Sequence, residues 1–204
     1  MSNLKEEIFE TNTLIGGWYI PETLCDDMVN YFNKNKDRAV PGLLAYKENN
    51  RNAKKSLDLG ISSKNFEIPF YDYRNTLQSC LDNYLKKYPY VDRLEKFNVV
   101  EDYNIQYYKP KEGFYVYHYE DSGQIFPSRR CLVFLTYLND VKDGGTQFYY
   151  QGITVKAKKG LTLIWPAYFT HTHKGQISMI EEKYILTGWF SYEDIKSEQT
   201  DTTL

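Results

Sequence analysis

The spacing of apolar positions predicts a helical first part of the chain. Apolar residues recur every three or four positions over residues 22–35, and again from Pro69 to the paired lysines Lys86 and Lys87. This period is typical of amphipathic helices, and lysines at the end of the second stretch suit a helix C-terminus. We therefore predict one helix in each stretch.

From about residue 97 onward, short alternating segments are separated by Gly, Pro, Asn and Asp, a pattern typical of antiparallel strands. The predicted strands cover residues 98–108, 114–120, 130–138, 146–150, 153–156, 161–165, 170–174 and 183–191. Asp143-Gly144-Gly145 and Lys159-Gly160 have the composition of turns. Eight short strands after a helical leader predict a mainly β (α+β) fold, a double-stranded β-helix or jelly-roll barrel braced by N-terminal helices.

The length of 204 residues indicates a single domain with a substantial core. We expect a helical and loop leader over about 1–97, the barrel over about 98–191, and a frayed polar tail over 192–204. The polar segment from Lys47 to Lys55 lacks an apolar period and is interpreted as a mobile lid or a surface loop.

Composition narrows the function classes. The formal net charge of -2 provides no basic field that would hold nucleic acid or anionic lipid. The three cysteines are odd in number, widely spaced and free of CxxC patterns, which argues against disulfides and a zinc site. No signal-like leader and no apolar run of about eighteen residues is present. We expect a cytoplasmic protein, in the host cytoplasm if it is viral, without a nucleic-acid or membrane partner.

The most informative polar residues are histidines, of which the chain has three, at positions 118, 171 and 173. His118 and Glu120 are two residues apart on a predicted strand, so their side chains share one face. This favours Glu120 over Asp121 as a ligand, although a bulge would reverse that choice. His171 and His173 also share a face, and either one could supply the second imidazole.

Two imidazoles and one carboxylate that leave coordination positions free suit a mononuclear non-haem Fe(II) and point to an oxygenase. Zinc accepts the same ligands, but zinc hydrolases usually add a positioned general base, and the sequence has no HExxH motif. Iron is therefore favoured over zinc.

The motifs of residues 98–191 resemble the 2-oxoglutarate- and Fe(II)-dependent oxygenases, in particular the prolyl 4-hydroxylase branch with its small phage and bacterial members. That family has a Tyr, a Gly-x-Tyr, an H-x-D, a Tyr-Leu-Asn strand, a Gly-Gly-x-x-x-Phe turn, a distal His, and a basic residue about ten positions later. The matching residues here are, in order, Tyr108, Gly113, Tyr115, His118, Tyr137, Gly144, Gly145, Phe148, His173 and Lys183. Glu120 departs from the usual Asp but keeps a hard oxygen donor for iron.

The resemblance implies a role for each matched residue. The ten-residue step to Lys183 selects His173 as the metal ligand and leaves His171 near the metal or on the substrate side. Lys183 would pair with the distal carboxylate of 2-oxoglutarate, helped by the Tyr137 hydroxyl, and Tyr108 would lie near the chelating end. A buried dicarboxylate needs a cationic partner, and the chain has no arginine after Arg130 that could replace the lysine. Residues that match the substrate side of the family are Tyr115, Arg130 and Trp189.

The resemblance also implies an activity: a dioxygenase that uses Fe(II), 2-oxoglutarate and O2, with ascorbate as a reductant, and releases succinate and CO2. Its expected product is a hydroxylated C–H bond, in a prolyl residue of a peptide or protein partner. Because the carboxylate ligand is kept, the halogenase variation of the family is disfavoured. Two alternatives are a 2-oxoglutarate oxygenase acting on a nucleobase, lipid or free amino acid, and a noncatalytic jelly-roll binding module.

Overall fold

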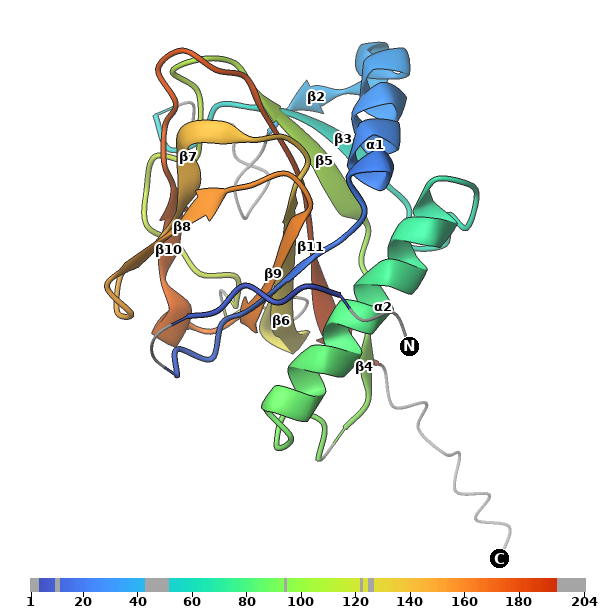
Figure 1. Cartoon of the computed structure of the whole chain (residues 1–204), viewed down its shortest axis with the longest axis vertical. Helices are drawn as coiled ribbons and strands as arrows, with labels where there is room; N and C mark the ends of the chain where they lie inside the picture. Colours follow the sequence, from blue (N-terminus) through green and yellow to red (C-terminus); the bar gives the residue numbers. More distant parts are fainter. Residues whose placement is uncertain are drawn as a thin grey trace, which may run out of the picture.

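The computed structural model describes residues 4–9, 12–42, 52–93, 95–121, 123–124 and 127–193. Its helices and strands are β1 (Gly16–Tyr19), α1 (Glu22–Lys34), β2 (Val40–Pro41), β3 (Leu57–Ile61), α2 (Phe70–Lys87), β4 (Phe97–Asn98), β5 (Tyr103–Tyr108), β6 (Arg130–Tyr137), β7 (Val141–Phe148), β8 (Ile153–Ala157), β9 (Leu161–Pro166), β10 (His173–Gly175) and β11 (Lys183–Tyr192). The large antiparallel sheet has the order β1-β9-β6-β11-β5-β3-β2, with β4 also pairing β11, and a small sheet has the order β10-β7-β8. The two sheets enclose the barrel seen in Figure 1, which confirms the predicted fold class.

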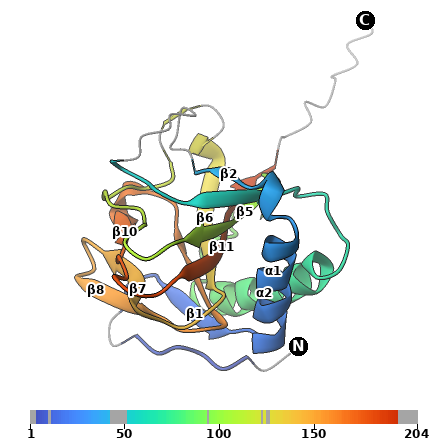
Figure 2. The same cartoon turned by 90° about the horizontal axis from the view of Figure 1, so that it is seen from above.

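Both helices pack on the outer face of the large sheet, as Figures 1 and 2 show. Along β6, Leu132 and Phe134 pack with the helices, whereas Val133, Leu135 and Tyr137 belong to the core between the sheets. This alternation follows from the two-residue period of a strand. Because both faces of the large sheet are covered, the neighbouring strands β6 and β9 are apolar along most of their length.

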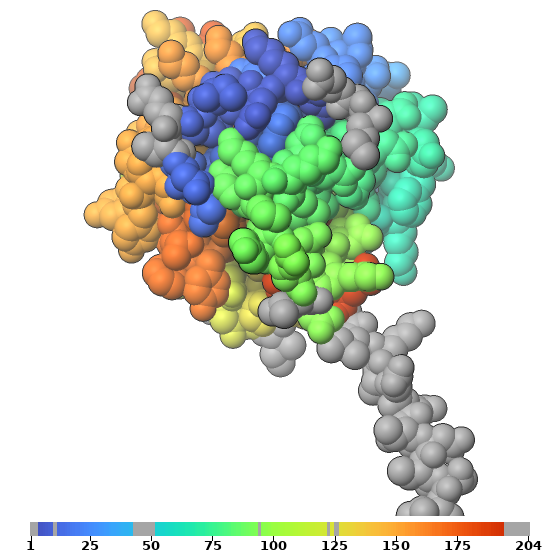
Figure 3. Space-filling view, turned by 60° about the horizontal axis from the view of Figure 1, so that its bottom comes forward, coloured from blue at the N-terminus to red at the C-terminus, as the bar shows by residue number. Residues whose placement is uncertain are grey.

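Helix α2 also holds the N-terminal segment against the barrel. The Tyr84 hydroxyl donates a hydrogen bond of 2.8 Å to the carbonyl oxygen of Leu14, and Lys87 forms an ion pair of 2.7 Å with Glu6. Figure 3 shows the blue N-terminal surface beside the green surface that contains α2. The two predicted helices are confirmed to within one residue at each end.

The leader, predicted as mainly helices and loops, also contains the strands β1, β2 and β3, which the sequence analysis did not identify. Strand β1 pairs with β9, and β3 pairs with β5 while β2 extends the sheet beyond β3. These strands are short, and β1 and β3 are placed in the sheet by partners more than forty residues away in the sequence. Local periodicity therefore did not identify them.

Two predicted strands differ at the metal end of the barrel. Residues 114–120 form isolated bridges, Lys54 with Phe114 and His118 with His173, in place of a continuous strand. Residues 169–171 form a 3-10 helix, so the strand predicted at 170–174 begins only at His173. Single contacts with several neighbours hold each of these segments. A regular strand pattern therefore did not predict their structure.

Two further boundaries are corrected. The strand predicted over 98–108 is split into β4 and β5. The strand predicted over 146–150 begins earlier, at Val141, because Asp143-Gly144-Gly145 forms an irregularity inside β7 and not a turn. A Cβ atom on Gly145 would lie 2.0 Å from the Val155 carbonyl oxygen, so the close approach of β8 requires glycine at this position. The Lys159-Gly160 turn is present, with Gly160 at a φ of +82°.

The polar segment from Lys47 to Lys55 falls largely among residues 43–51, outside the described residues, as does the tail from residue 194 onward. The last residues of the Lys47 to Lys55 segment are described. Lys54 is only 4% exposed, so the expectation of a solvated surface loop is wrong for that residue. Among the described helices, none has both the length and the apolar character that a bilayer span requires.

Candidate metal centre

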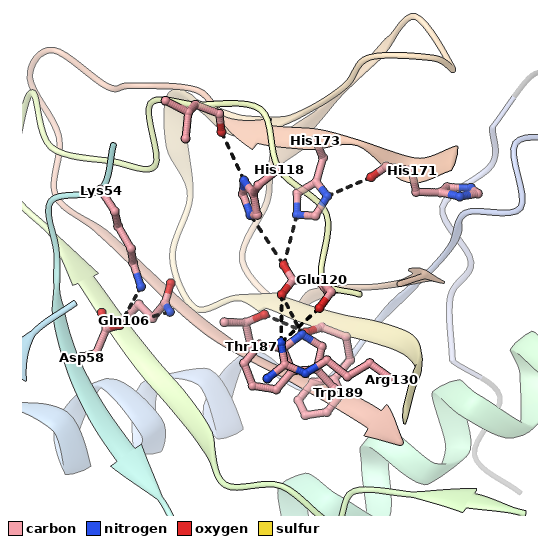
Figure 4. A network of polar contacts seen from close by, with 12 residues as sticks. Lys54, Asp58, Gln106, His118, Glu120, Arg130, His171, His173, Thr187 and Trp189 are labelled. Carbon is pink, nitrogen blue, oxygen red and sulfur yellow. Dashed lines mark hydrogen bonds and ion pairs between the residues drawn. The ribbon is translucent and has the colours of Figure 1, made fainter. Parts of the chain in front are cut away.

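Three side chains from separate segments meet at one end of the barrel. His118 and Glu120 lie between β5 and β6, and His173 is the first residue of β10. Their potential ligand atoms all lie within 4.8 Å of one another. Glu120 Oε1 is 3.5 Å from His118 Nε2 and 3.7 Å from His173 Nε2, and Figure 4 shows both rings pointing at it. The structure therefore brings the predicted triad together, whereas the alternative Asp121 accepts a hydrogen bond from the Gly123 backbone.

Backbone carbonyls orient both imidazoles. His118 Nδ1 lies 3.1 Å from the Val116 oxygen, and His173 Nδ1 lies 2.9 Å from the His171 oxygen. A carbonyl only accepts, so Nδ1 carries the proton in each ring and a neutral Nε2 is left as the ligand atom. Burial, together with the nearby His118, lowers the pKa of His173 to about 3, so protons do not compete for this nitrogen at neutral pH.

Aromatic rings restrict the movement of the two histidines. The Phe114 ring stacks on His118 with 3.6 Å between the ring centroids. On the other side of the pair, Phe148 and Trp165 contact the ring of His173, with centroids 5.8 and 5.0 Å away. Rings that are locked in this way keep the nitrogen atoms in place before any ion binds.

The second oxygen of Glu120 is bound by the protein itself. Trp189 Nε1 donates a hydrogen bond of 2.9 Å to Glu120 Oε2, and an Arg130 nitrogen lies 3.5 Å from the same oxygen. The Arg130 guanidinium lies 3.5 Å from the Trp189 ring centroid. Burial alone would raise the pKa of Glu120, but the Arg130 guanidinium lowers it. The carboxylate is therefore charged and offers Oε1 to an ion.

Arg130 and Trp189 were expected on the substrate side by resemblance, and both do line the cavity. The structure adds that they orient the carboxylate ligand. Arg130 is held in turn by Glu101, 2.7 Å away, and Glu101 accepts a hydrogen bond from Ser191. Glu101 was missed by sequence reasoning because it lies in an irregular segment and no spacing pattern relates it to Arg130.

His171 and Tyr115 lie elsewhere than expected. His171 Nε2 is 2.9 Å from the Thr13 carbonyl oxygen, and the residue is buried at the N-terminal segment, outside the cavity. The Tyr115 hydroxyl donates to the Lys111 carbonyl, and this side chain does not line the cavity either. The expectation that they face a substrate is therefore not supported. The 3-10 helix at 169–171 turns His171 away from His173 and leaves its carbonyl to orient the ligand.

The three ligands open into a cavity of about 790 Å³. Its floor is the inner face of the large sheet, where every second residue of β5, β6 and β11 lines it. These residues are Asn104, Gln106, Tyr108, Val133, Leu135, Tyr137, Lys183, Ile185, Thr187 and Trp189. A volume of this size accommodates small organic ligands.

Lys183 is a buried cation in the wall of this cavity. It is 6% exposed, and its Nζ lies 3.1 and 3.2 Å from the carbonyl oxygens of Gly144 and Gln176. Within the described part of the chain it forms no ion pair with a carboxylate, and burial lowers its pKa to about 8. Its Nζ also lies 4.9 Å from the Tyr108 ring centroid. An anion entering the cavity would supply the missing counter-charge.

The two predicted tyrosines lie on the wall of the same cavity. The Tyr137 hydroxyl is 2.6 Å from Thr146 Oγ1, and the Tyr108 hydroxyl donates to Gln106 Oε1. Sequence reasoning assigned no role to Gln106 or to Thr146, although Thr146 directly follows the matched Gly144-Gly145 pair. A strand alternation counted outward from Tyr108 would have placed Gln106 on the inner face.

The donor set fits a first-row metal ion. Two neutral imidazole nitrogens and one carboxylate oxygen converge, and the cavity leaves room for further ligands beside them. A second anionic group in the cavity would meet Lys183. The residues therefore fit Fe(II) together with a chelating dicarboxylate.

Comparisons with known proteins give a family match over part of the chain and a shared fold. The family model described as "2OG-Fe(II) oxygenase superfamily" matches residues 103–191, and no curated protein matches the chain. A prolyl-4-hydroxylase from Pseudomonas putida is 15% identical with a TM-score of 0.65, over 88% of this chain and 93% of that chain. The viral collagen prolyl hydroxylase of Paramecium Bursaria Chlorella virus-1, solved as a 2OG complex, is 19% identical with a TM-score of 0.66, over 88% and 97%.

A third similar structure is a prolyl hydroxylase from Trichoplax adhaerens, in complex with a peptide of the hypoxia inducible factor oxygen degradation domain. It is 13% identical with a TM-score of 0.68, over 89% of this chain and 84% of that chain. At these identities the likeness establishes the shared fold.

Proposed function

We propose that the protein is a 2-oxoglutarate- and Fe(II)-dependent dioxygenase that hydroxylates a prolyl residue in a peptide or protein. The match of residues 103–191 to the family model of the 2OG-Fe(II) oxygenase superfamily supports this proposal. The superfamily uses Fe(II), 2-oxoglutarate and O2. The observation that carries the proposal is one cavity that holds both the His118, Glu120 and His173 cluster and the buried cation Lys183.

The residues of this chain supply binding and orientation. His118, Glu120 and His173 would hold the iron, with Trp189 fixing the free oxygen of the carboxylate. Bound iron and 2-oxoglutarate supply the oxidation, in which O2 and 2-oxoglutarate yield succinate, CO2 and a hydroxylated C–H bond. Lys183 would neutralise the distal carboxylate of the cosubstrate.

The apolar part of the wall excludes water from the reacting groups. Val133, Leu135 and Ile185 line the cavity between the metal ligands and Lys183, and all three are buried. A dry site strengthens the electrostatic contacts of a bound dicarboxylate and limits side reactions of activated oxygen.

The prolyl substrate is the finer part of the proposal. It is supported by the fold shared with prolyl hydroxylases from a bacterium, a virus and an animal, one of them solved with a peptide. The balanced charge of the chain disfavours a nucleic-acid substrate. The complete ligand cluster and the buried lysine without a carboxylate partner lie in the same cavity. Together they argue against a noncatalytic binding module, which would need neither.

Two measurements test the proposal in sequence. Anaerobic addition of Fe(II) and 2-oxoglutarate should produce a weak visible charge-transfer band that is absent in His173→Ala; no band in the parent protein would favour the binding module. Succinate formation is then compared with proline-containing peptides and with oligonucleotides. An oxygenase that peptides do not stimulate would refute the prolyl substrate while leaving the reaction class intact.

A further inference from the structure

One wall of the cavity carries a buried ion pair that has no part in holding the iron or the cosubstrate's distal carboxylate. Lys54 Nζ lies 2.7 Å from Asp58 Oδ2, and the two residues are 4% and 8% exposed. Both line the cavity. Figure 4 shows the pair on the opposite side of the view from Arg130 and Trp189, with the histidines above and between them.

The hydrogen bonds of this pair leave the lysine with unused donors. Asp58 accepts from Lys54, from Ser56 Oγ at 2.7 Å and from Gln106 Nε2 at 3.3 Å, so its oxygens are well satisfied. An ammonium group has three N–H donors. Within the described residues, the Lys54 ammonium group makes one hydrogen bond, to Asp58. Two N–H donors are therefore left for a molecule in the cavity.

Stability alone does not explain a buried ion pair at this position. Replacing such a pair by apolar residues of similar volume is often neutral or stabilising, because desolvation offsets the attraction between the charges. The position is informative instead. Lys54 Nζ lies 5.8 Å from the centroid of Phe114, the ring that stacks on the metal ligand His118. One aromatic ring therefore separates the ammonium group from the metal centre.

We propose that Lys54 donates a hydrogen bond to a main-chain carbonyl oxygen of the polypeptide substrate, beside the residue whose C–H bond is hydroxylated. This inference rests on the proposed function and names the group that recognises the substrate backbone. A peptide carbonyl that enters the cavity loses its water and needs a donor. Asp58 and Gln106 hold Lys54 in the position to provide one.

The charge of the wall selects a carbonyl over a carboxylate. Lys54 and Asp58 together are neutral, so a substrate carboxylate would gain the lysine but also approach the aspartate. A neutral carbonyl needs only the N–H donor and meets no repulsion. The wall thus favours an internal peptide residue over a free amino acid.

The test uses the full-length protein with decaproline, acetylated at its N-terminus and amidated at its C-terminus. Lys54→Met should raise the KM for this peptide in succinate formation by about 10- to 100-fold, the effect of losing a hydrogen bond from a charged donor. The Kd of the fluorescently labelled peptide for the metal-free protein should rise equally. Lys54→Arg, which keeps a charged donor, should recover most of the affinity.

Two further variants keep the result interpretable. Lys54→Met combined with Asp58→Asn removes the pair without leaving a buried unpaired charge, and it should show the same loss if the single variant is poorly folded. Lys55→Met is the matched control, because the neighbouring Lys55 is 42% exposed in its side chain and pairs with Glu112. The control should bind decaproline as the parent protein does.

Three outcomes overturn the inference. An unchanged peptide Kd in the Lys54 variants would show that the lysine does not contact the substrate. A parallel loss of 2-oxoglutarate affinity would assign Lys54 to the cosubstrate. A parent protein that turns over free L-proline in preference to the blocked peptide would refute the choice of a carbonyl. If decaproline neither binds to the parent protein nor stimulates it, the prolyl substrate fails as well, and this result is distinct from a peptide response that Lys54 does not affect.

Discussion

Replacing Lys183 by methionine should stabilise the protein in the absence of 2-oxoglutarate and abolish binding of that cosubstrate. Burial lowers the pKa of Lys183 from 10.5 to about 8. At about 1.36 kcal/mol per pH unit, this difference corresponds to roughly 3 kcal/mol that the folded protein loses by keeping the lysine charged. Methionine has a similar length and carries no charge, so Lys183→Met removes this cost.

The sign of the pH dependence follows from the lowered pKa. Below pH 8 the lysine is charged in the folded and unfolded states, and the full cost is present. Between pH 8 and 10.5 the unfolded chain binds more protons than the folded one, so this contribution to the free energy of unfolding rises with pH. The advantage of Lys183→Met should therefore be greatest near pH 7 and shrink towards pH 10.

The assay is urea denaturation of the metal-free and cosubstrate-free protein at pH 7 and pH 9.5. At pH 7 the variant should be more stable by about 1–3 kcal/mol, the lower figure allowing for its lost contacts with Gly144 and Gln176. Calorimetric titration should show 2-oxoglutarate affinity reduced by more than about 100-fold, since the bound dicarboxylate loses its counter-charge. The exposed strand residue Lys156 serves as the control, and Lys156→Met should change stability by less than about 0.5 kcal/mol.

A Lys183→Met variant that is less stable than the parent protein at pH 7 would refute this reasoning. It would mean that contacts with carbonyls and the Tyr108 ring outweigh the cost of burying the charge. Unchanged 2-oxoglutarate affinity would separately remove Lys183 from the cosubstrate site, together with the main support for the proposed function.

Three other substitutions test the surroundings of the metal and the bulge in β7. Trp189→Phe keeps an aromatic ring but removes the donor to Glu120 Oε2, and Co(II) affinity followed by visible absorption should fall by about 10- to 100-fold; an unchanged affinity would mean that the indole does not orient the ligand. Glu120→Asp should weaken Co(II) binding in the same titration, because the shorter aspartate side chain moves the carboxylate away from Trp189. This is expected even though aspartate is usual in the family that the chain resembles. Tighter Co(II) binding would contradict the role given to the Trp189 hydrogen bond. Gly145→Ala would bring a Cβ atom to 2.0 Å from a backbone oxygen of Val155 and should lower the free energy of unfolding by about 1–3 kcal/mol in urea. Gly60→Ala, whose Cβ atom would come no closer than 3.9 Å to a neighbour, should cost less.

The local pattern of apolar residues was sufficient to predict those elements whose structure is set by their own sequence. Helices α1 and α2 follow a strong three-to-four residue period, and their observed bounds agree with the predicted ones to within one residue. The central strands β6, β9 and β11 are apolar enough to be found from sequence. The short strands β1 and β3, at or next to the sheet edges, were not found, because they depend on pairing with β9 and β5, which lie far away in the sequence.

The residues of the metal cluster were predicted correctly, but the reason given, two side chains on one face of a regular strand, does not hold. His118 and Glu120 do point to one place, yet the segment that carries them is no regular strand; single bridges to Lys54 and His173 hold it instead. His171 shows the opposite case. The two-residue spacing put it on the face of His173, and the 3-10 helix at 169–171 turned its ring towards Thr13.

By itself the sequence determined which chemistry this protein is able to offer: histidines among the predicted barrel strands, a carboxylate two residues from the first, and a lysine as the last basic group that a barrel strand could bury. Those are properties of residue type and spacing, which survive without knowledge of partners. The tertiary structure alone decided which oxygen of Glu120 faces the histidines, and that Arg130 and Trp189 hold the other one while Glu101 holds Arg130. It also decided that Lys54 leaves a polar loop to line the cavity. Each of these contacts joins segments separated by ten or more residues, or a buried side chain to a cavity, and burial and long-range contact are set only when the sheets close on each other.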